Sequence, residues 1–425
     1  MDANQTRRSF LIGGAAVAGY AAGSDAIRVG LIGCGGRGTQ ATEQALTADK
    51  GARLVAMADV RLDRLQEKRT ALRLKFSGQV SVDDNHCFAG FDGYKHVIES
   101  SDVVVIANAA KFHPLHMMAA IRAGKHVFVE KPHAIDPAGI KMVKAACDLA
   151  RQKNLSVQSG LQSRWWAGFR ETVARVHDGA IGDVVSMQEN FLRAPYVLYP
   201  RVAGLTEVEY QASNQYHFHW LSGDDVPQSL VHNLDRSSWV LRNQAPLKCW
   251  GMGGRSTLKG EIYGSVFDHH AVVYEFPAGV RVYAFCRTIP GCYNENSSII
   301  LGTKGRCFLS QLRIEGETKW VYPGAKMYAD PNMNPYQVEH NELFKSIRAG
   351  KAINAGDYMA RSTLTGIMGQ LSCYTGKEVT WEQAANSDFY YAPRPEDVRK
   401  DMEPPVKPGP DGTYPVFTPG ETKLL

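Results

Sequence analysis

The stretch IRVGLIGCGGRG, residues 27–38, decides the fold. An apolar run comes first, and Gly33, Gly35 and Gly38 then form the pattern G-x-G-x-x-G. The first glycine of this pattern permits a tight turn, the second lets the backbone approach a pyrophosphate, and the third lets a helix pack close to the strand. The free N–H groups at the start of such a helix face the phosphates. The stretch therefore predicts a strand, a turn and a helix that hold a dinucleotide.

An acidic residue follows at the spacing that this motif requires. Asp59 ends the next apolar run, about 20 residues after Gly38. A carboxylate at this place accepts hydrogen bonds from the adenosine ribose and repels a 2′-phosphate, which favours NAD over NADP. Arg37, Arg61 and Arg64 stand nearby in the sequence, and an arginine beside the ribose can hold a phosphate. We therefore expect NAD and keep NADP as the alternative.

Short apolar runs alternate with amphipathic stretches from residue 27 to about residue 160. We expect strands at 27–33, 53–59, 102–108 and 126–130, and helices near 37–48, 61–74, 114–123 and 137–152. This alternation is typical of a Rossmann domain, a doubly wound parallel sheet with helices on both faces. The later runs are longer and are separated by glycine turns, which predicts a second α/β domain with an open, mainly antiparallel sheet.

The first residues have the character of an export leader. TRRSFL, residues 6–11, precedes a weakly apolar run at 12–22 and is typical of a twin-arginine signal. We therefore predict recognition by the Tat export machinery and a periplasmic or otherwise exported protein, or a cytoplasmic one if the leader does not function. The predicted organisation is a signal peptide at 1–23, the NAD(P)-binding Rossmann domain at 27–152, a substrate and oligomerisation domain at 153–387, and an irregular, exposed tail at 388–425.

Composition narrows the class of protein further. The 425 residues suffice for two domains, and a formal net charge of +5, evenly spread, gives no support for binding nucleic acid. After the leader, no apolar run reaches the length of about 20 residues that spans a bilayer. The 8 cysteines contain no C-x-x-C pair, so free buried thiols are expected, as at Cys34 and Cys147, and a Cys286–Cys292 pairing stays open.

Three further segments, together with the glycine motif, carry a family resemblance. They are AGKHVFVEKP at 123–132, WLSGDDVPQSLVHNLDRSSWVL at 220–241 and GIMGQLSCYTGKEVTW at 366–381. With these segments the chain resembles the Gfo/Idh/MocA family, named after glucose-fructose oxidoreductase, inositol dehydrogenase and a rhizopine-catabolism protein. The resemblance extends over nearly the whole chain after Ile27. It implies a homo-oligomer as well as the two-domain fold.

The resemblance implies two catalytic residues, Lys131 and His232. In the family, the lysine of Glu-Lys-Pro lies beside the nicotinamide and the substrate. Lys131 also follows a parallel strand, at the edge of an open α/β sheet where ligands bind. The family histidine shares a proton with a carboxylate four residues earlier, but this chain has Gln228 there, which cannot take a proton. The acid and base work therefore shifts to His232, alone or with Lys131, or to a residue outside the motif.

Other polar residues near these motifs are candidates for contact with ligands. The predicted substrate-binding residues are Gln162, Arg164, Tyr216, His219, Gln228 and Asp235. The predicted cofactor-binding residues are Gly33, Cys34, Gly35, Gly36, Arg37, Gly38, Asp59, Asn108, His113, His116, Glu130 and Lys131. No metal site is expected, because the H-x-H at 217–219 has no third ligand at a suitable spacing.

These residues together predict an NAD(P)-dependent oxidoreductase that acts on a hydroxyl carbon of a sugar, a polyol or a glycoside. An exported protein has no replenished NAD pool, so we expect the cofactor to be held tightly and recycled on the protein. Two alternatives stay open. One is an NAD-retaining glycoside hydrolase that works by transient oxidation and elimination, and the other is a non-catalytic sugar-binding protein with structural NAD.

Overall fold

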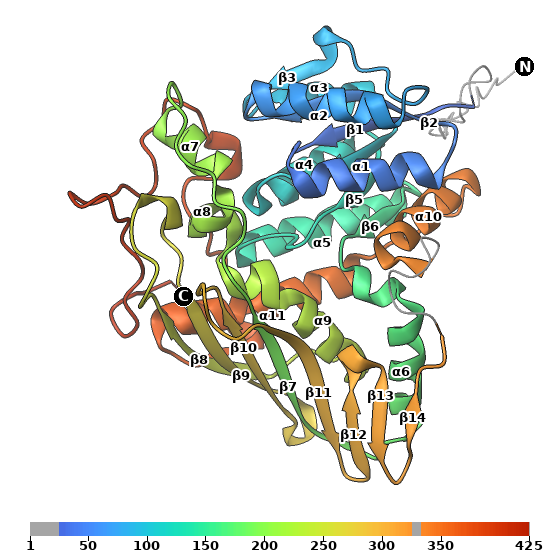
Figure 1. Ribbon diagram of the computed structural model, residues 1–425, viewed down its shortest axis with the longest axis vertical. Helices are drawn as coiled ribbons and strands as arrows, with labels where there is room; N and C mark the ends of the chain where they lie inside the picture. Colours follow the sequence, from blue (N-terminus) through green and yellow to red (C-terminus); the bar gives the residue numbers. More distant parts are fainter. Residues whose placement is uncertain (1–24, 325–332, 425) are drawn as a thin grey trace, which may run out of the picture.

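The computed structural model describes residues 25–324 and 333–424 and shows two sheets, one above the other (Figure 1). The predicted twin-arginine leader at 1–23 lies outside the described residues. Buried apolar side chains fill both halves of the molecule. No helix in the described part of the chain is long and apolar enough to cross a membrane.

The first sheet has six parallel strands in the order β3-β2-β1-β4-β5-β6. The strands are β1 (Ile27–Ile32), β2 (Ala52–Asp59), β3 (Cys87–Ala89), β4 (Val103–Ile106), β5 (His126–Val129) and β6 (Val157–Ser159). Their side chains are largely buried, because helices cover both faces of a parallel sheet. The predicted Rossmann fold is therefore confirmed.

The helices that cover this sheet are α1 (Gly36–Ala48), α2 (Leu62–Lys75), α3 (Gly93–Ser100), α4 (His113–Arg122) and α5 (Pro137–Gln152). The sequence patterns did not predict β3 and α3, because a three-residue edge strand and an eight-residue helix are too short to show a clear period. β6 belongs to the first sheet although it lies beyond residue 152, and the division of the chain into domains stays a prediction.

The second sheet has nine strands in the order β14-β13-β12-β11-β7-β10-β9-β8-β15. They are β7 (Val184–Leu192), β8 (Lys248–Gly254), β9 (His269–Glu275), β10 (Arg281–Arg287), β11 (Glu295–Gly302), β12 (Gly305–Phe308), β13 (Arg313–Gly316), β14 (Trp320–Val321) and β15 (Val379–Thr380). Only the β10–β7 pair is parallel among these described strands. The mainly antiparallel sheet predicted for the second half is therefore confirmed.

Helices connect the two halves. α9 (Val231–Val240) and α11 (Gly356–Thr375) lie between the sheets, and α11 packs against both α5 and β8 (Figure 1). α10 (Pro335–Arg348) packs on α1. The remaining helices are α6 (Ala167–His177), α7 (Glu207–Ser213), α8 (His219–Ser222) and α12 (Trp381–Asn386).

The end of the chain corrects one expectation. The segment after Asp388 is irregular, as predicted, but it is not exposed along its length: Tyr391, Val398 and Tyr414 are at most 5% exposed. Tyr414 packs edge-on against Phe218, with ring centroids 4.9 Å apart. These apolar side chains fasten the tail to the body of the protein.

All eight cysteines are free thiols, with Cys286 buried and Cys292 exposed, so the pairing left open between them is not formed.

Candidate active site

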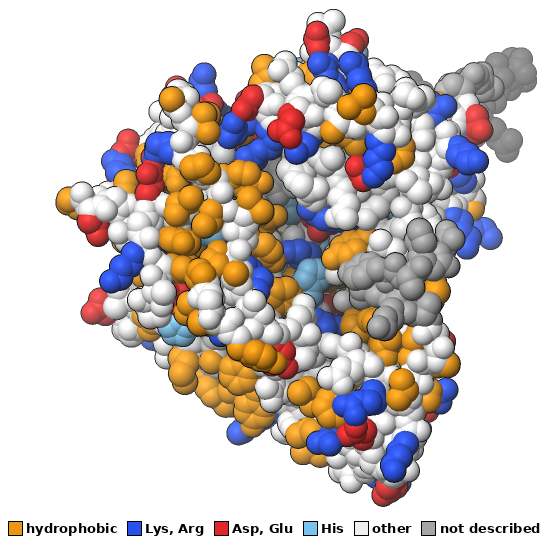
Figure 2. Space-filling view, in the orientation of Figure 1, with side chains coloured by type: hydrophobic (Ala, Val, Ile, Leu, Met, Phe, Trp, Pro, Cys, Tyr) orange, Lys and Arg blue, Asp and Glu red, His pale blue; other side chains and the backbone are white. Residues whose placement is uncertain are grey.

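Two adjoining cavities lie at the carboxyl ends of the parallel strands. The larger has a volume of about 590 Å³ and is lined from both halves of the molecule. The smaller lies over the glycine turn after β1, and both cavities share Arg37, Asn108, Gln215 and Tyr216 in their walls. The hollow between the two halves is visible in Figure 2. A ligand can therefore extend from the glycine turn to the second half of the chain.

The glycine turn forms a cradle that a dinucleotide fits. Gly33 has a φ of +96°, and a Cβ atom on Gly38 would lie 1.9 Å from the carbonyl oxygen of Gly33, so the turn and helix α1 are packed together. By contrast, a Cβ atom on Gly35 or Gly36 would have no neighbour within 4 Å. Both of these glycines line the smaller cavity, at the N-terminus of α1. The backbone is therefore open to a pyrophosphate where the motif requires it.

Asp59 closes the far side of this cradle. Its carboxylate accepts hydrogen bonds from the backbone N–H of Cys34 at 2.7 Å and of Arg61 at 3.0 Å, and it lines the smaller cavity. Burial raises the pKa of Asp59, while the positive charge of Arg64 acts in the opposite direction. Asp59 therefore stands where an adenosine ribose would be bound.

Two predicted cofactor contacts lie behind the cradle rather than in it. The Cys34 side chain is fully buried, its thiol donates to the carbonyl of Ala58, and only its backbone N–H serves the site, through Asp59. Gly38 packs against Gly33 and lines neither cavity. The other predicted cofactor residues line one or both cavities: Gly33, Gly35, Gly36, Arg37, Asp59, Asn108, His113, His116, Glu130 and Lys131.

The segment after β7 forms a roof over the smaller cavity. Tyr199, Ser213, Gln215 and Tyr216 line this cavity from the second half of the chain. The guanidinium of Arg64 lies 4.6 Å from the centre of the Tyr199 ring and donates to the carbonyl of Ser213 at 3.4 Å. The adenosine end of a bound dinucleotide would therefore be covered.

His113 and His116 support the wall between the two cavities. The ring of His113 lies between two carbonyl oxygens, 2.8 Å from that of Pro132 and 3.0 Å from that of Asn108. His116 stacks on Tyr94, and among the described residues neither of its buried ring nitrogens has a hydrogen-bond partner. Burial lowers the pKa of His116 to about 3. Burial also lowers the pKa of His113, while its contacts with the two carbonyl oxygens act in the opposite direction.

Lys131 stands on the wall of the larger cavity. It follows β5 and precedes Pro132 through a cis peptide bond. Its Nζ donates to the carbonyl oxygen of Gln228 at 2.6 Å. Its neighbour Glu130 is paired with Arg37, with 2.6 Å between Oε1 and Nε. The ammonium group is therefore held in place by a neutral carbonyl, and its charge is directed to the cavity.

His232 lines the same cavity from the first turn of α9. Burial and the positive charges of Lys131, Arg236 and Arg37 hold the pKa of His232 well below its usual range. Its Nδ1 is buried and has no hydrogen-bond partner in the described part of the chain. A neutral imidazole is a proton acceptor, so the ring is in the form that a general base needs.

Gln228 lies in η5 (Val226–Leu230), a turn of π-helix that runs into α9. It lines the larger cavity, so the structure brings Lys131, Gln228 and His232 together. Such turns are frequent at functional sites because they change the direction of side chains within a helix.

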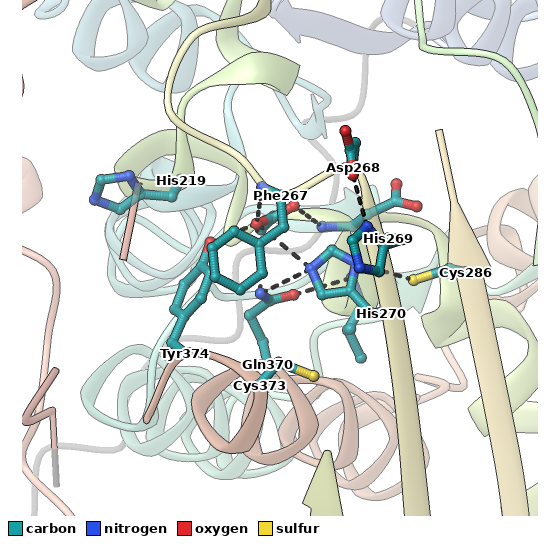
Figure 3. A network of polar contacts seen from close by, with 12 residues as sticks. His219, Phe267, Asp268, His269, His270, Cys286, Gln370, Cys373 and Tyr374 are labelled. Atoms are coloured by element: carbon teal, nitrogen blue, oxygen red, sulfur yellow. Dashed lines mark hydrogen bonds and ion pairs between the residues drawn. The ribbon is translucent and has the colours of Figure 1, made fainter. Parts of the chain in front are cut away.

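A buried network holds the start of this turn. The carboxylate of Asp224 accepts hydrogen bonds from the hydroxyl of Tyr374 at 2.5 Å and from the backbone of Phe267 at 2.9 Å. The ring of His270 lies 3.6 Å from the same carboxylate, and Gln370 joins them (Figure 3). The backbone of Asp224 accepts from Gln228, so the network supports the cavity wall without lining it.

Arg164 and Asp235 correct the prediction that they bind substrate. The guanidinium of Arg164 donates to both oxygens of Asp235 at 2.8 to 3.0 Å, and Ser362 on α11 donates to the same carboxylate. The Asp235 side chain is 0% exposed, and neither residue lines the cavity. The ion pair joins the short helical turn at Gln162–Trp165 to α9, and Ser362 joins the same carboxylate to α11.

His219 was also predicted to bind substrate, but it does not line the larger cavity. Its Nδ1 lies 2.8 Å from the hydroxyl of Ser265, and its ring packs near Tyr391 and Phe417 of the tail. It lines a separate surface hollow and points away from the network in Figure 3. Gln162 and Tyr216, in contrast, line the larger cavity, and their contact with a substrate stays a prediction. Among the described residues, no cluster of three or more ligands could hold a metal ion.

Several cavity residues were not predicted from the sequence. They are Tyr196, Arg236, Asn296, Ser310 and Tyr336. One signal was available for Arg236, because it stands four residues after His232 and shares its face of a helix. The others come from distant segments, and only the folded chain brings them to the site.

The comparisons with known proteins agree with this geometry. Residues 27–161 match the model of an oxidoreductase family with an NAD-binding Rossmann fold, Gfo/Idh/MocA. The inositol 2-dehydrogenase of Acidothermus cellulolyticus is 29% identical over 215 residues, which are 50% of this chain and 53% of that protein. The chain therefore matches about half the length of that curated relative.

Solved structures resemble nearly the whole fold. The myo-inositol 2-dehydrogenase of Lactobacillus plantarum has a TM-score of 0.62 at 18% identity, over 84% of this chain and 99% of that one. A levoglucosan dehydrogenase in complex with NADH and levoglucosan has a TM-score of 0.64 at 16% identity, over 83% and 99%. Residues 27–161 of the chain thus match the Gfo/Idh/MocA oxidoreductase family, whose description is an NAD-binding Rossmann fold.

Proposed function

We propose that this protein is an NAD-dependent oxidoreductase that acts on a hydroxyl carbon of a sugar, a polyol or a glycoside. The observation that carries the proposal is the placement of Lys131 and a neutral His232 in one cavity, which continues into the dinucleotide cradle. The relatives named as inositol 2-dehydrogenases support a polyhydroxylated substrate.

The side chains divide the proton work between them. NAD, when bound, supplies the redox chemistry by taking up or returning two electrons and one proton. The neutral ring of His232 accepts the proton of the substrate hydroxyl. The ammonium group of Lys131 donates a hydrogen bond to the same oxygen and stabilises the negative charge that develops there. Gln228 orients a hydroxyl by hydrogen bonding, because an amide cannot take a proton.

We also propose that the cofactor is retained during turnover. The roof formed by Tyr199, Ser213, Gln215 and Tyr216 supports this, because a covered dinucleotide cannot leave without movement of that segment. Retention of the cofactor suits an exported protein. We include in this proposal that the twin-arginine leader directs the protein to export. Denaturing the purified protein should release NAD in an amount close to that of the chain.

The test uses the purified protein without added cofactor, against free sugars, polyols and aryl glycosides. Stoichiometric formation of reduced nicotinamide with a free sugar or polyol supports the dehydrogenase. Release of aglycone with no net reduction of the cofactor indicates a redox glycosidase instead. Binding without any conversion indicates a sugar-binding protein and overturns the proposal.

A further inference from the structure

Arg236 on α9 lines the larger cavity, and the proton transfer proposed above does not use it. It is only 4% exposed. No carboxylate of the described residues lies within 4.0 Å of its guanidinium. A buried cation is costly unless it is paired, because transfer out of water removes its hydration. An unpaired guanidinium in a cavity wall therefore calls for a ligand.

Neutral groups position this guanidinium from behind. Its Nη2 donates to the side-chain oxygen of Asn233 at 2.6 Å, and its Nε donates to the backbone oxygen of His232 at 3.2 Å. The amide of Asn233 in turn donates to Glu189 at 3.0 Å. Glu189 and Asp235 attract the guanidinium without being hydrogen-bonded to it, and burial raises the pKa of Glu189 to about 7 while the positive charge of Arg236 acts in the opposite direction.

The groups beside Arg236 are able to donate hydrogen bonds into the cavity. Arg236 donates through Nη2 to the oxygen of Asn296 at 3.0 Å, which leaves the NH₂ of Asn296 as a donor. Nη1 reaches the hydroxyl of Ser310 at 3.4 Å. That hydroxyl also accepts from the backbone N–H of Ser298, so its own proton is left to donate. All three side chains line the cavity.

The charges of the residues that line the cavity also favour an anionic ligand. Among the described residues that line it, Glu130 is the one carboxylate, and it is already paired with Arg37. Lys131 and Arg236 have no such partner and add two positive charges. Because Lys131 serves the reacting hydroxyl, Arg236 is left to balance one negative charge. One cation matches a carboxylate better than a phosphate ester, which carries about −1.5 to −2 at pH 7.

The spacing suits a six-membered sugar ring. His232 and Arg236 stand four residues apart on α9, so their side chains leave the helix about 5–6 Å apart on one face. A ring that presents a hydroxyl to His232 can present a substituent to Arg236. We propose that the substrate is a sugar acid whose carboxylate is bound by Arg236, Asn296 and Ser310. This inference rests on the proposed function for the reaction, but its carboxylate site is testable by binding alone.

The experiment measures binding by calorimetry with the cofactor-holding protein. The probes are D-glucuronate and D-galacturonate, each paired with its neutral carboxamide. Because hydrogen bonds to a charged group are stronger than neutral ones, we expect each acid to bind about tenfold to a hundredfold more tightly than its amide. In Arg236→Gln this preference should shrink to within a few-fold, and in Arg236→Lys part of it should remain.

Arg122→Gln, at the exposed end of α4, is the matched control and should keep the full preference. The comparison of acid with amide in the unaltered protein requires no variant, so misfolding of Arg236→Gln does not obscure the result. Equal binding of acid and amide, an unchanged preference in Arg236→Gln, or no binding of either acid overturns the inference. So does tight binding of a sulfated sugar when both uronates fail.

The two proposals fail separately. If the uronates bind with the expected preference and no sugar reduces the cofactor, the carboxylate site stands and the proposed oxidoreductase falls. If neutral polyols are oxidised and acids are not preferred, the oxidoreductase stands and the carboxylate site falls.

Discussion

At the scale of single residues, the cavity wall contains a neutral group, His232, and a charged group, Lys131, and we assign them different roles. His232 is uncharged because burial and three nearby cations disfavour its protonation. Lys131 is held by the carbonyl of Gln228 in the wall of the same cavity. A carboxylate at position 228 would compete for the substrate proton, and the amide there does not.

The first prediction concerns His232. His232→Asn removes the proton acceptor while it keeps a polar side chain of similar reach. Turnover should fall by about 10²–10⁴-fold, the usual contribution of a general base, with KM changed far less. Steady-state kinetics on the cofactor-holding protein measures this. His96→Asn, on an exposed face of α3, should change neither value, and turnover of His232→Asn within a few-fold of the parent would exclude this role.

The motifs that are local in sequence were predicted well, and those that depend on distant partners were not. The glycine turn, Asp59, Lys131 and His232 line the cavities because each is positioned by its own strand or helix. Nothing in the sequence near Arg164 shows that its partner would be a carboxylate on another helix.

At the scale of elements, α9 has two roles. One side of this helix lines the cavity, and an ion pair on its other side holds the helix in place. Its cavity side carries His232 and Arg236, and its other side carries Asp235, paired with Arg164. The strands of the first sheet were predictable because buried parallel strands are continuous apolar runs. The short elements β3 and α3 were missed because a few residues show no reliable period.

The second prediction tests this bracing. Asp235→Asn leaves the largely buried guanidinium of Arg164, whose side chain is 13% exposed, without its charge partner, so the free energy of unfolding should fall by up to about 3–5 kcal/mol. Asp357→Asn breaks an exposed pair with Arg151 and should cost less than about 1 kcal/mol. Urea unfolding followed by circular dichroism compares the two. Equal, small losses would show that the buried pair does not brace α9.

At the scale of the whole molecule, buried neutral histidines make the fold sensitive to acid. Burial lowers the pKa of His113, His116, His126, His133, His217, His219, His232 and His340. In the unfolded chain a histidine takes a proton below a pH of about 6.5, whereas the folded protein excludes it until a lower pH. Their contribution to stability is therefore complete above that pH and is lost as the pH falls below it.

The third prediction follows from the direction of these pKa shifts. Each such histidine lowers the free energy of unfolding by up to about 1.4 kcal/mol per pH unit below a pH of about 6.5. The urea midpoint should therefore decrease clearly between about pH 7.5 and pH 5. Measurements in high salt separate this effect from surface charge, which salt screens. A midpoint that does not change over this range would contradict the assignment of these rings as neutral.

The fourth prediction is that the protein forms a homo-oligomer through the outer face of the second sheet. The family resemblance implies a homo-oligomer. Trp250, Val273, Tyr283, Gln188 and Ile299 pair in register across five neighbouring strands of this face. Tyr283 is 38% exposed, and Met252 and Leu301 on the same sheet are 72% and 46% exposed. Apolar side chains gather over β8 to β10 in Figure 2. An apolar face of this kind marks an interface, and we propose that a second copy of the chain covers it.

Light scattering during size-exclusion chromatography tests this pairing. The unaltered protein should have at least twice the mass of one chain, and Tyr283→Glu should shift it toward the monomer because a buried, unpaired charge is costly. Tyr293→Glu, in an exposed turn between β10 and β11, is the control. A monomeric parent protein would contradict the proposed pairing.

The most direct test of the central claim is a single-turnover measurement on the protein as it is purified, with the cofactor that it retains. The protein is mixed with myo-inositol, glucose or glucuronate, and the near-ultraviolet absorbance of reduced nicotinamide is followed. The account predicts an absorbance rise equivalent to the bound cofactor with at least one of these compounds, and a rise slowed by about 10²–10⁴-fold in His232→Asn. Saturable binding of all three without any absorbance change, or an equal rate in His232→Asn, would contradict it.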